Sequence, residues 1–180
     1  GAADCTAKVT GLGPLAADLA RAPAEAPALS VILPDACHGG REGACPVGEP
    51  DGLARADAWL REWVPQLLAA AAYADDTMLV ITFDQARAAG PGSDLASCCG
   101  QQQAVNEPAN VDPQAPPDGG GRVGALVLSP RVAAGRVSNV AYNHFALLRT
   151  IEQTFGLDLL GLAGADGLKP FGDDIFDARP

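Results

Sequence analysis

The chain of 180 residues lacks a long hydrophobic run, although 48% of its residues are hydrophobic. A membrane-spanning helix needs about 20 consecutive apolar residues, and no stretch of the sequence reaches that length. No charged start followed by an apolar core is present, so no signal peptide is visible. The chain also begins at Gly1 without a Met. We therefore expect a processed, cropped or partial chain, in which a missing signal peptide does not argue against export.

Positive charge is also scarce in this sequence. The chain has 12 Lys and Arg residues against 22 Asp and Glu residues, which gives a formal net charge of −10. A chain this acidic repels a nucleic-acid backbone and an anionic membrane surface, so neither is expected as a partner. A small phosphorylated substrate is not excluded, because a bound cation can reverse the local field.

The five cysteines do not form a recognisable zinc motif, because the sequence has no Cys-x-x-Cys or His-x-x-x-His pair. Cys37 and Cys45 enclose a short Gly-rich loop, and we predict a local disulfide between them. Cys5, Cys98 and Cys99 have no partner that the sequence identifies. Two readings stay open: an exported, oxidised protein, which we favour, and a cytosolic protein with buried thiols.

Apolar patterning predicts an α/β chain that forms a single domain over residues 1–180. Helical spacing is found in three segments: 12–22, 51–73 and 142–157. Short runs of mostly branched apolar residues predict three strands: 28–34, 77–83 and 122–130. Because these runs are continuous and do not alternate with polar residues, we predict a parallel or mixed sheet with helices on both faces. Residues 85–121 form a loop long enough to suggest a functional role.

Polar side chains follow each predicted strand, where ligands bind in open α/β sheets. They are Asp35 and His38 after the first strand, Asp84 and Gln85 after the second, and His144 beyond the third, at the start of the last helix. Carboxylates and imidazoles on separate strand ends suit a divalent cation. The alternative is structural: an Asp at a strand end can cap a turn, and each histidine can be an ordinary loop or core residue.

Six motifs, taken in order, resemble the C-terminal half of a secreted bacterial phosphoesterase family that includes acid phosphatases and phospholipase C enzymes. The motifs are "LSVILPDACHGG", "ADAWLREWVPQLLA", "LVITFDQAR", "SCCGQQ", "VGALVLSPRV" and "YNHFALLRTIEQTFGL". The last motif is quite specific, whereas the Phe-Asp-Gln element is specific only in this context. The resemblance implies an alkaline-phosphatase-like α/β fold that lacks its N-terminal half here. A thin sheet of three predicted strands agrees with that expectation.

The resemblance implies metal-dependent hydrolysis of phosphate esters in a secreted or cell-envelope protein. Asp84, Gln85 and His144 match positions that help to hold a divalent metal, His38 would be a ligand or an acid–base group, and Asp35 would be a substitute ligand. The hydroxyl nucleophile of the family belongs to the absent half, so we expect this chain alone to be inactive. The implied substrate is a small phosphorylated molecule or a phospholipid head group.

This sequence departs from the family pattern at two acidic positions. The usual loop Asp is Gly39, and the Glu that usually follows the strand-end Asp is Gln85. Two readings therefore compete with an acid phosphatase: a phospholipase C-type phosphodiesterase, and a catalytically degenerate binding module that kept the fold. If a metal site is present, Asp84, His38 and His144 should converge beyond one edge of the sheet, within about 10 Å of one another.

Overall fold

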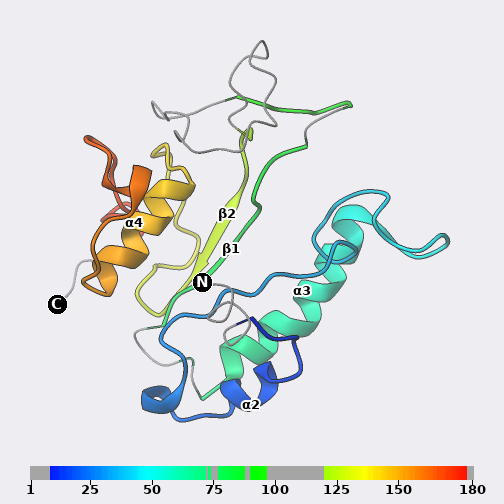
Figure 1. Cartoon of the computed structure of the whole chain (residues 1–180), viewed down its shortest axis with the longest axis horizontal. Helices are drawn as coiled ribbons and strands as arrows, with labels where there is room; N and C mark the ends of the chain where they lie inside the picture. The colour runs from blue at the N-terminus through cyan, green and yellow to red at the C-terminus, as the bar shows by residue number, and fades with distance from the viewer. Residues whose placement is uncertain (1–8, 72, 74–76, 88–89, 97–119, 178–180) are drawn as a thin grey trace. The chain divides into compact units, whose positions relative to one another are not determined.

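The computed structural model describes residues 9–71, 73, 77–87, 90–96 and 120–177. The chain divides into two compact units, Gly1–Thr77 and Met78–Pro180, whose elements are drawn in Figure 1. The structure is mixed α/β, as predicted. Among the described residues, every helix is too short or too polar to cross a membrane. The assignment of the whole chain to one domain stays a prediction.

The first unit begins with a short helix, α2 (Leu15–Leu19), followed by the 3-10 helix η1 (Pro23–Glu25). Pro14 stands immediately before α2, as expected for a residue whose fixed φ suits a helix start. The predicted helix over 12–22 is thus confirmed in type, but it is shorter. No side chain of α2 is buried, and a single turn without tertiary packing has little to extend it.

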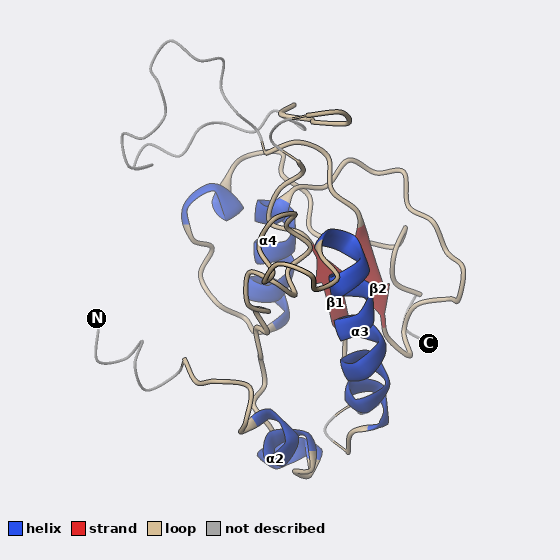
Figure 2. Ribbon diagram, turned by 90° about the vertical axis from the view of Figure 1, so that its right-hand side faces the viewer, coloured by secondary structure: helices blue, strands red, loops and turns tan. Residues whose placement is uncertain are grey.

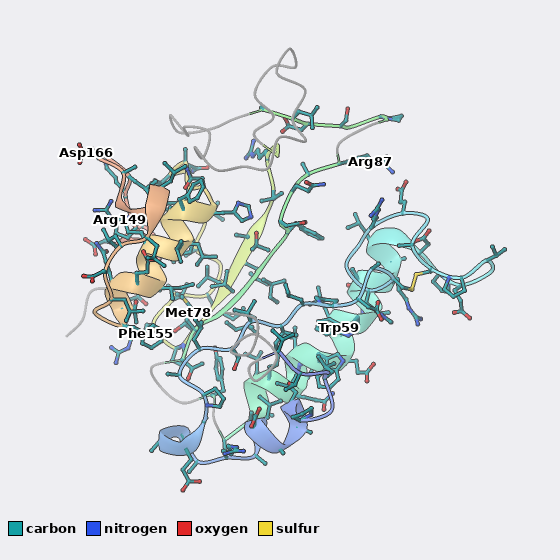
Figure 3. The ribbon with its side chains drawn as sticks, viewed as in Figure 1. Trp59, Met78, Arg87, Arg149, Phe155 and Asp166 are labelled. Carbon is teal, nitrogen blue, oxygen red and sulfur yellow. A yellow bond between two sulfur atoms is a disulfide. The ribbon has the colours of Figure 1, made fainter. Side chains whose placement is uncertain are left out.

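The long helix of the first unit, α3 (Gly52–Ala69), is capped by Asp51, whose side chain accepts a hydrogen bond from the Gly52 backbone N at 2.6 Å. The helix continues through Pro65 as one element, although proline removes one backbone hydrogen bond. Trp59 lies on α3 and contacts the ring of Trp63 one turn later, with ring centroids 6.0 Å apart (Figure 3).

The predicted strand over 28–34 was wrong, because no strand forms there. Leu29, Val31 and Leu33 are 53%, 73% and 81% exposed. An apolar run becomes a strand only when a neighbouring strand accepts and donates its backbone hydrogen bonds. Among the described residues, this segment has no such partner.

The sheet consists of β1 (Leu79–Thr82) and β2 (Ala125–Leu128), both in the second unit. The two strands lie side by side (Figure 2). They are antiparallel, with Leu79 opposite Leu128 and Thr82 opposite Ala125. The prediction of a parallel or mixed sheet was therefore wrong for the described residues. Continuous apolar runs report burial and not strand direction, and the long connection lets the chain return beside β1. Helices on both faces and an alkaline-phosphatase-like arrangement stay predictions.

The helix α4 (His144–Thr154) confirms the prediction over 142–157. Asn143 is its N-cap, and the Asn143 side chain accepts a hydrogen bond from the Ala146 backbone N at 2.9 Å. Such a cap satisfies one of the backbone donors that a helix start leaves unpaired. The cap therefore fixes where α4 begins and places His144 in its first turn.

The buried face of α4 differs from the apolar face that its spacing predicts. Ala146, Thr150 and Glu152 are buried, whereas Phe155 at the C-terminal end is exposed (Figure 3). Thr150 is accommodated because its hydroxyl donates to the Ala146 carbonyl at 2.7 Å and accepts from the Phe171 backbone N at 2.8 Å. The helix is thus packed through paired polar groups as much as through apolar contacts.

The C-terminal segment packs on α4 through the 3-10 helix η2 (Gly161–Gly164). Arg149 on α4 donates from Nη1 to the carbonyl oxygens of Ala163 and Ala165, at 3.2 and 3.1 Å (Figure 3). Buried Glu152 accepts from the Leu160 backbone N at 3.1 Å. These polar contacts hold the segment beside the helix that carries His144.

Candidate functional site

Asp35 and His38 contact each other in a tight turn of the first unit. Asp35 Oδ1 accepts from the backbone N of His38 at 3.0 Å and lies 2.7 Å from its ring Nδ1. The Asp35 carbonyl accepts from the backbone N of His38 and Gly39, at 3.1 and 2.9 Å. A Cβ added to Gly39 would lie 3.3 Å from the Asp35 carbonyl oxygen. Glycine at this position therefore avoids a tight contact in the turn.

The Asp35–His38 pair is held at the surface of its unit. The hydrogen bond from the His38 side chain, followed by the bond from its backbone, lowers the pKa of Asp35 below its ordinary value. The side chain of His38 is 25% exposed, and that of Asp35 is 69% exposed. The other ring nitrogen of His38, Nε2, has no hydrogen-bond partner among the described residues. One nitrogen of this imidazole is thus engaged and the other is available for chemistry.

The predicted disulfide between Cys37 and Cys45 is present and closes the loop that carries His38 (Figure 3). Its Cα atoms lie 4.5 Å apart, within the usual range for a disulfide. Asp51 joins this loop to α3, because Asp51 Oδ2 accepts from the Gly43 backbone N at 2.5 Å while Oδ1 caps the helix. We call residues 35–52 the His38 loop. Its turn, its disulfide and its Asp51 contacts all lie within the segment.

His144 lies in the second unit, at the start of α4, and its ring Nε2 is 2.8 Å from the carbonyl oxygen of Phe83. Phe83 directly follows β1, so this hydrogen bond joins the first turn of α4 to the end of the strand. The two residues are 61 positions apart in the sequence. We call His144, Phe83 and Asp84 the His144 site. Here too one ring nitrogen is engaged, while Nδ1 has no hydrogen-bond partner among the described residues.

Asp84 and Gln85 come directly after Phe83 in the sequence, and both are exposed. Asp84 Oδ1 accepts from the Gln85 backbone N at 2.9 Å, which is the turn-capping role that the structural alternative predicts. The nearby hydroxyl of Thr82 donates to the Gly124 carbonyl at 3.0 Å. Asp84 thus stands one residue from the carbonyl that holds His144, and its role as a metal ligand stays a prediction.

Asp94 joins the two described ends of the long loop, residues 85–87 with 90–96 and residues 120–122. Asp94 accepts from the backbone N of Ala96 and of Arg122, both at 2.9 Å. These two bonds lower the pKa of Asp94, in that order of size. Gly121 has a φ of +74°, and a Cβ there would lie 2.1 Å from the Asp94 carbonyl oxygen. Only glycine fits where Gly121 passes the Asp94 carbonyl, shortly before β2 begins.

A shallow hollow of about 80 Å³ lies between the sheet and α4 in the second unit. Its polar lining residues are Thr82, Tyr142, Asn143 and His144. The remaining lining residues are Val80, Val123, Ala125, Leu147 and Phe171. The hollow is large enough for a small chemical group beside His144, and it is mainly apolar.

A polar network beside this hollow was not predicted from the sequence. Asp174 accepts hydrogen bonds from the hydroxyls of Ser138 and Tyr142, the latter at 2.6 Å. Burial, followed by Asp174, raises the pKa of Tyr142 to about 12. Burial pushes the pKa of Asp174 upward, but the bonds from Ser138 and Tyr142 outweigh it and lower that pKa. The Tyr142 ring also contacts the ring of Phe171, with centroids 4.8 Å apart.

A complete metal site is not formed by the parts of the chain that the structure describes, where no three His, Cys, Asp or Glu side chains gather as ligands. Asp35 and His38 belong to one unit, whereas Asp84 and His144 belong to the other. Their convergence therefore stays a prediction. The remaining cysteines, Cys5, Cys98 and Cys99, lie outside the described residues.

The comparison with known families covers both histidine regions. The chain matches the model of the Phosphoesterase family over residues 15–158. That match contains Asp35, His38, Asp84, Gln85 and His144. No curated protein and no solved structure matches the chain. Because the family match spans most of the sequence, the chain belongs to the phosphoesterase family.

Proposed function

We propose that this protein hydrolyses phosphate esters of the acid phosphatase type, with His38 and His144 as its proton-transfer groups. The observation that carries the proposal is that the family match contains two histidines, each with one ring nitrogen held by an acceptor. A fixed imidazole with one available nitrogen can accept a proton from an attacking oxygen or return one to a leaving group.

The attacking hydroxyl is proposed to come from outside the described residues. Two hydroxyls near strand ends support this, because both are already engaged. Thr82 Oγ1 donates to the Gly124 carbonyl at 3.0 Å, and Ser129 Oγ accepts from the Arg131 backbone N at 3.2 Å. Neither is paired with a histidine, as an activated nucleophile requires. We therefore propose that a further part of the phosphoesterase fold is needed for turnover.

A divalent cation is part of the proposal, with Asp84, His144, Asp35 and Gln85 as candidate ligands. When bound, such a cation polarises a phosphoryl oxygen and neutralises developing charge. The described residues do not complete a site for it, so no reaction step is assigned to the cation. Further ligands would come from other residues of the fold.

An exported location is proposed for the protein, either secreted or in the cell envelope. The Cys37–Cys45 disulfide supports it, because such bonds persist in oxidising compartments. The proposed substrate is a small phosphorylated molecule or a phospholipid head group. The acidic net charge of −10 supports neither nucleic acid nor an anionic membrane surface as a partner.

The test is turnover of p-nitrophenyl phosphate by the intact gene product and by residues 1–180 alone, across a series of divalent metals. We expect metal-dependent turnover by the intact product and none by residues 1–180. His144→Gln should lower kcat by about 100-fold or more, while Asn143→Ser keeps the helix cap and serves as a control. Turnover of p-nitrophenyl phosphorylcholine instead of the monoester would favour the phospholipase C-type reaction.

A catalytically degenerate binding module is the second candidate. It is supported by Gly39 and Gln85, which stand at positions where the resemblance leads us to expect carboxylates. This candidate predicts that the intact product binds inorganic phosphate or a phosphate ester but does not turn it over. Gln85→Glu would restore one acidic group, and a gain of turnover in that variant would identify the loss as the cause.

A further inference from the structure

We infer that Asp35 is a positioning residue for His38: it holds the imidazole with Nδ1 protonated and Nε2 as the available lone pair. This role is an alternative to the direct metal ligation that is proposed above for Asp35. It rests on the proposed function only where His38 is said to transfer a proton in the reaction. The pairing itself concerns two side chains of one turn and is measurable without substrate.

The hydrogen-bond geometry determines which ring nitrogen carries the proton. Asp35 Oδ1 lies 2.7 Å from His38 Nδ1 and also accepts from the His38 backbone N at 3.0 Å. The side chain of Asp35 is 69% exposed, and an exposed carboxyl group is ionised at neutral pH. An ionised carboxylate can only accept hydrogen bonds. Nδ1 must therefore be the donor, and Nε2 of the neutral ring has no proton.

His144 has the opposite arrangement and provides an internal comparison. Its Nε2 lies 2.8 Å from the Phe83 carbonyl oxygen, and a carbonyl oxygen can only accept. Nε2 is therefore protonated, and Nδ1 holds the lone pair. The chain has only two histidines, so the structure assigns one of each tautomer. Each tautomer is set by the acceptor on the opposite nitrogen.

The His38 loop explains how an exposed carboxylate can hold the ring. A hydrogen bond between exposed groups is weak when both partners move freely, because water competes for each of them. Here the disulfide between Cys37 and Cys45 closes the loop, and Asp51 ties Gly43 to the start of α3. The two side chains are three residues apart in this closed turn. Closure therefore lowers the entropy that the pair must lose to form.

The proton balance follows from the same geometry. When His38 acts as a base, an O–H bond of the attacking water or hydroxyl breaks, and its proton forms a new N–H bond at Nε2. The ring becomes an imidazolium with both nitrogens protonated. The Asp35 carboxylate on Nδ1 stabilises that positive charge without taking the proton itself, a role that carboxylates play for other catalytic and metal-bound histidines.

Long-range ¹H–¹⁵N correlation NMR of the full chain, at about pH 8.5 where an ordinary histidine is neutral, tests the assignment. In the wild type we expect the Nδ1–H pattern for His38 and the Nε2–H pattern for His144. His144→Gln assigns the two signals by removing one. Asp35→Ala should remove the preference of His38 for the Nδ1–H form, and Asp35→Glu should restore it in part. Asp57→Ala is the matched control, since Asp57 pairs with Arg61.

Two results would overturn the inference. The first is an Nε2–H pattern for His38 in the wild type, a result that does not depend on whether any variant folds. The second is an unchanged His38 tautomer in Asp35→Ala, in a protein whose His144 pattern shows that it is folded. A direct ligand would behave in this second way, because its loss weakens metal binding but leaves the metal-free tautomer unchanged.

Kinetics separate the inference from the proposed function. If the intact product turns over p-nitrophenyl phosphate, Asp35→Ala should lower kcat by about 10–100-fold with little change in KM. A KM effect alone would contradict the positioning role. Absence of turnover in the wild type, together with the expected tautomers, would refute the proposed function and leave the Asp35–His38 assignment standing.

Discussion

The His38 loop and the His144 site both hold an imidazole, but they do so by different means. The His38 loop is local: its turn, its disulfide and its Asp51 cap all lie within residues 35–52. The His144 site is long-range, because the His144 ring is held by a carbonyl 61 positions away. It requires β1, β2 and α4 to be in place. The first region should therefore survive damage elsewhere, whereas the second should fail whenever its unit loosens.

The difference also indicates what each region depends on energetically. A loop closed by a covalent bond gains stability mainly because the unfolded chain is restricted. A site assembled from a strand end and a helix start depends on the packing of its unit, which has few fully buried side chains. The buried residues in the described part of the second unit are Ala146, Ala163, Ile175, Thr150 and Glu152. Substitutions can thus break either region selectively.

The largest effect is expected from Gly121→Ala in the second unit. The new Cβ would lie 2.1 Å from the Asp94 carbonyl oxygen at a φ of +74°. The positive φ and the clash together should destabilise the unit by about 2–4 kcal/mol. Hydrogen exchange of the β1, β2 and α4 amides measures the loss. Gly124→Ala is the control, because no atom lies within 4 Å of its added Cβ; equal losses in the two variants would contradict the clash.

Removal of the disulfide should weaken the other region. Cys37→Ser combined with Cys45→Ser releases a loop whose ends are eight positions apart, at a cost of about 2–3 kcal/mol. We expect faster hydrogen exchange in the His38 loop and unchanged exchange in β1, β2 and α4. Unfolding in denaturant, followed by probes in each unit, gives the free-energy change. A matching loss in the second unit would show that the two regions are not independent.

A smaller effect is expected from Asn143→Ala, which removes the N-cap of α4. The Ala146 backbone N would lose its acceptor at 2.9 Å, which destabilises a helix by about 1 kcal/mol. Because His144 is the next residue, its hydrogen bond to Phe83 should weaken, and its Nε2–H pattern should become less pronounced. Asn143→Asp keeps a capping oxygen and should behave as the wild type. An unaffected His144 signal in Asn143→Ala would show that the strand alone orients the ring.

The smallest effect is expected from the ionisation of Tyr142, which changes the free energy of unfolding only at high pH. Its pKa is raised to about 12, first by burial and then by Asp174, whereas an unfolded tyrosine ionises near about 10. A raised folded pKa means that the stability contribution is present below pH 10 and is lost as pH rises toward 12. The chain has two tyrosines, so tyrosinate absorbance in a Tyr73→Phe background reports Tyr142.

A control for the tyrosine prediction is Asp174→Asn, which removes the second cause and leaves burial. The pKa of Tyr142 should then move part of the way back toward its ordinary value. Stability should also fall less steeply above pH 10. Ionisation of Tyr142 at an ordinary pKa in the folded protein would contradict the network seen beside the hollow.

Local chemistry made part of the fold predictable. The apolar spacing of the sequence identified α2, α3 and α4. The Cys37–Cys45 disulfide followed from two cysteines around a Gly-rich loop. The strand over 28–34 was wrong because its apolar residues say nothing about whether a neighbouring strand exists. The direction of the sheet was wrong for a related reason, since pairing is decided by residues far apart in the sequence.

In the candidate site, too, the sequence indicated the residues but not their contacts. Asp35, His38, Asp84 and His144 could be selected because few polar residues follow the apolar runs of this sequence. Their partners could not be selected in the same way. Nothing in the spacing of Phe83 and His144 predicts that a backbone carbonyl would hold the ring. The Asp174 network was missed because its residues come from two separated segments, with Asp174 lying 36 positions from Ser138 and 32 positions from Tyr142.

The sequence by itself determined the family, the helices, the disulfide and the two histidines. Each of these depends on residue type and short spacing, through caps, loop closure and apolar periodicity. The tertiary structure alone decided which nitrogen of each histidine is engaged and that β1 pairs antiparallel with β2. Hydrogen bonds are directional and act over about 3 Å. Their partners are therefore known only when distant segments have been brought together.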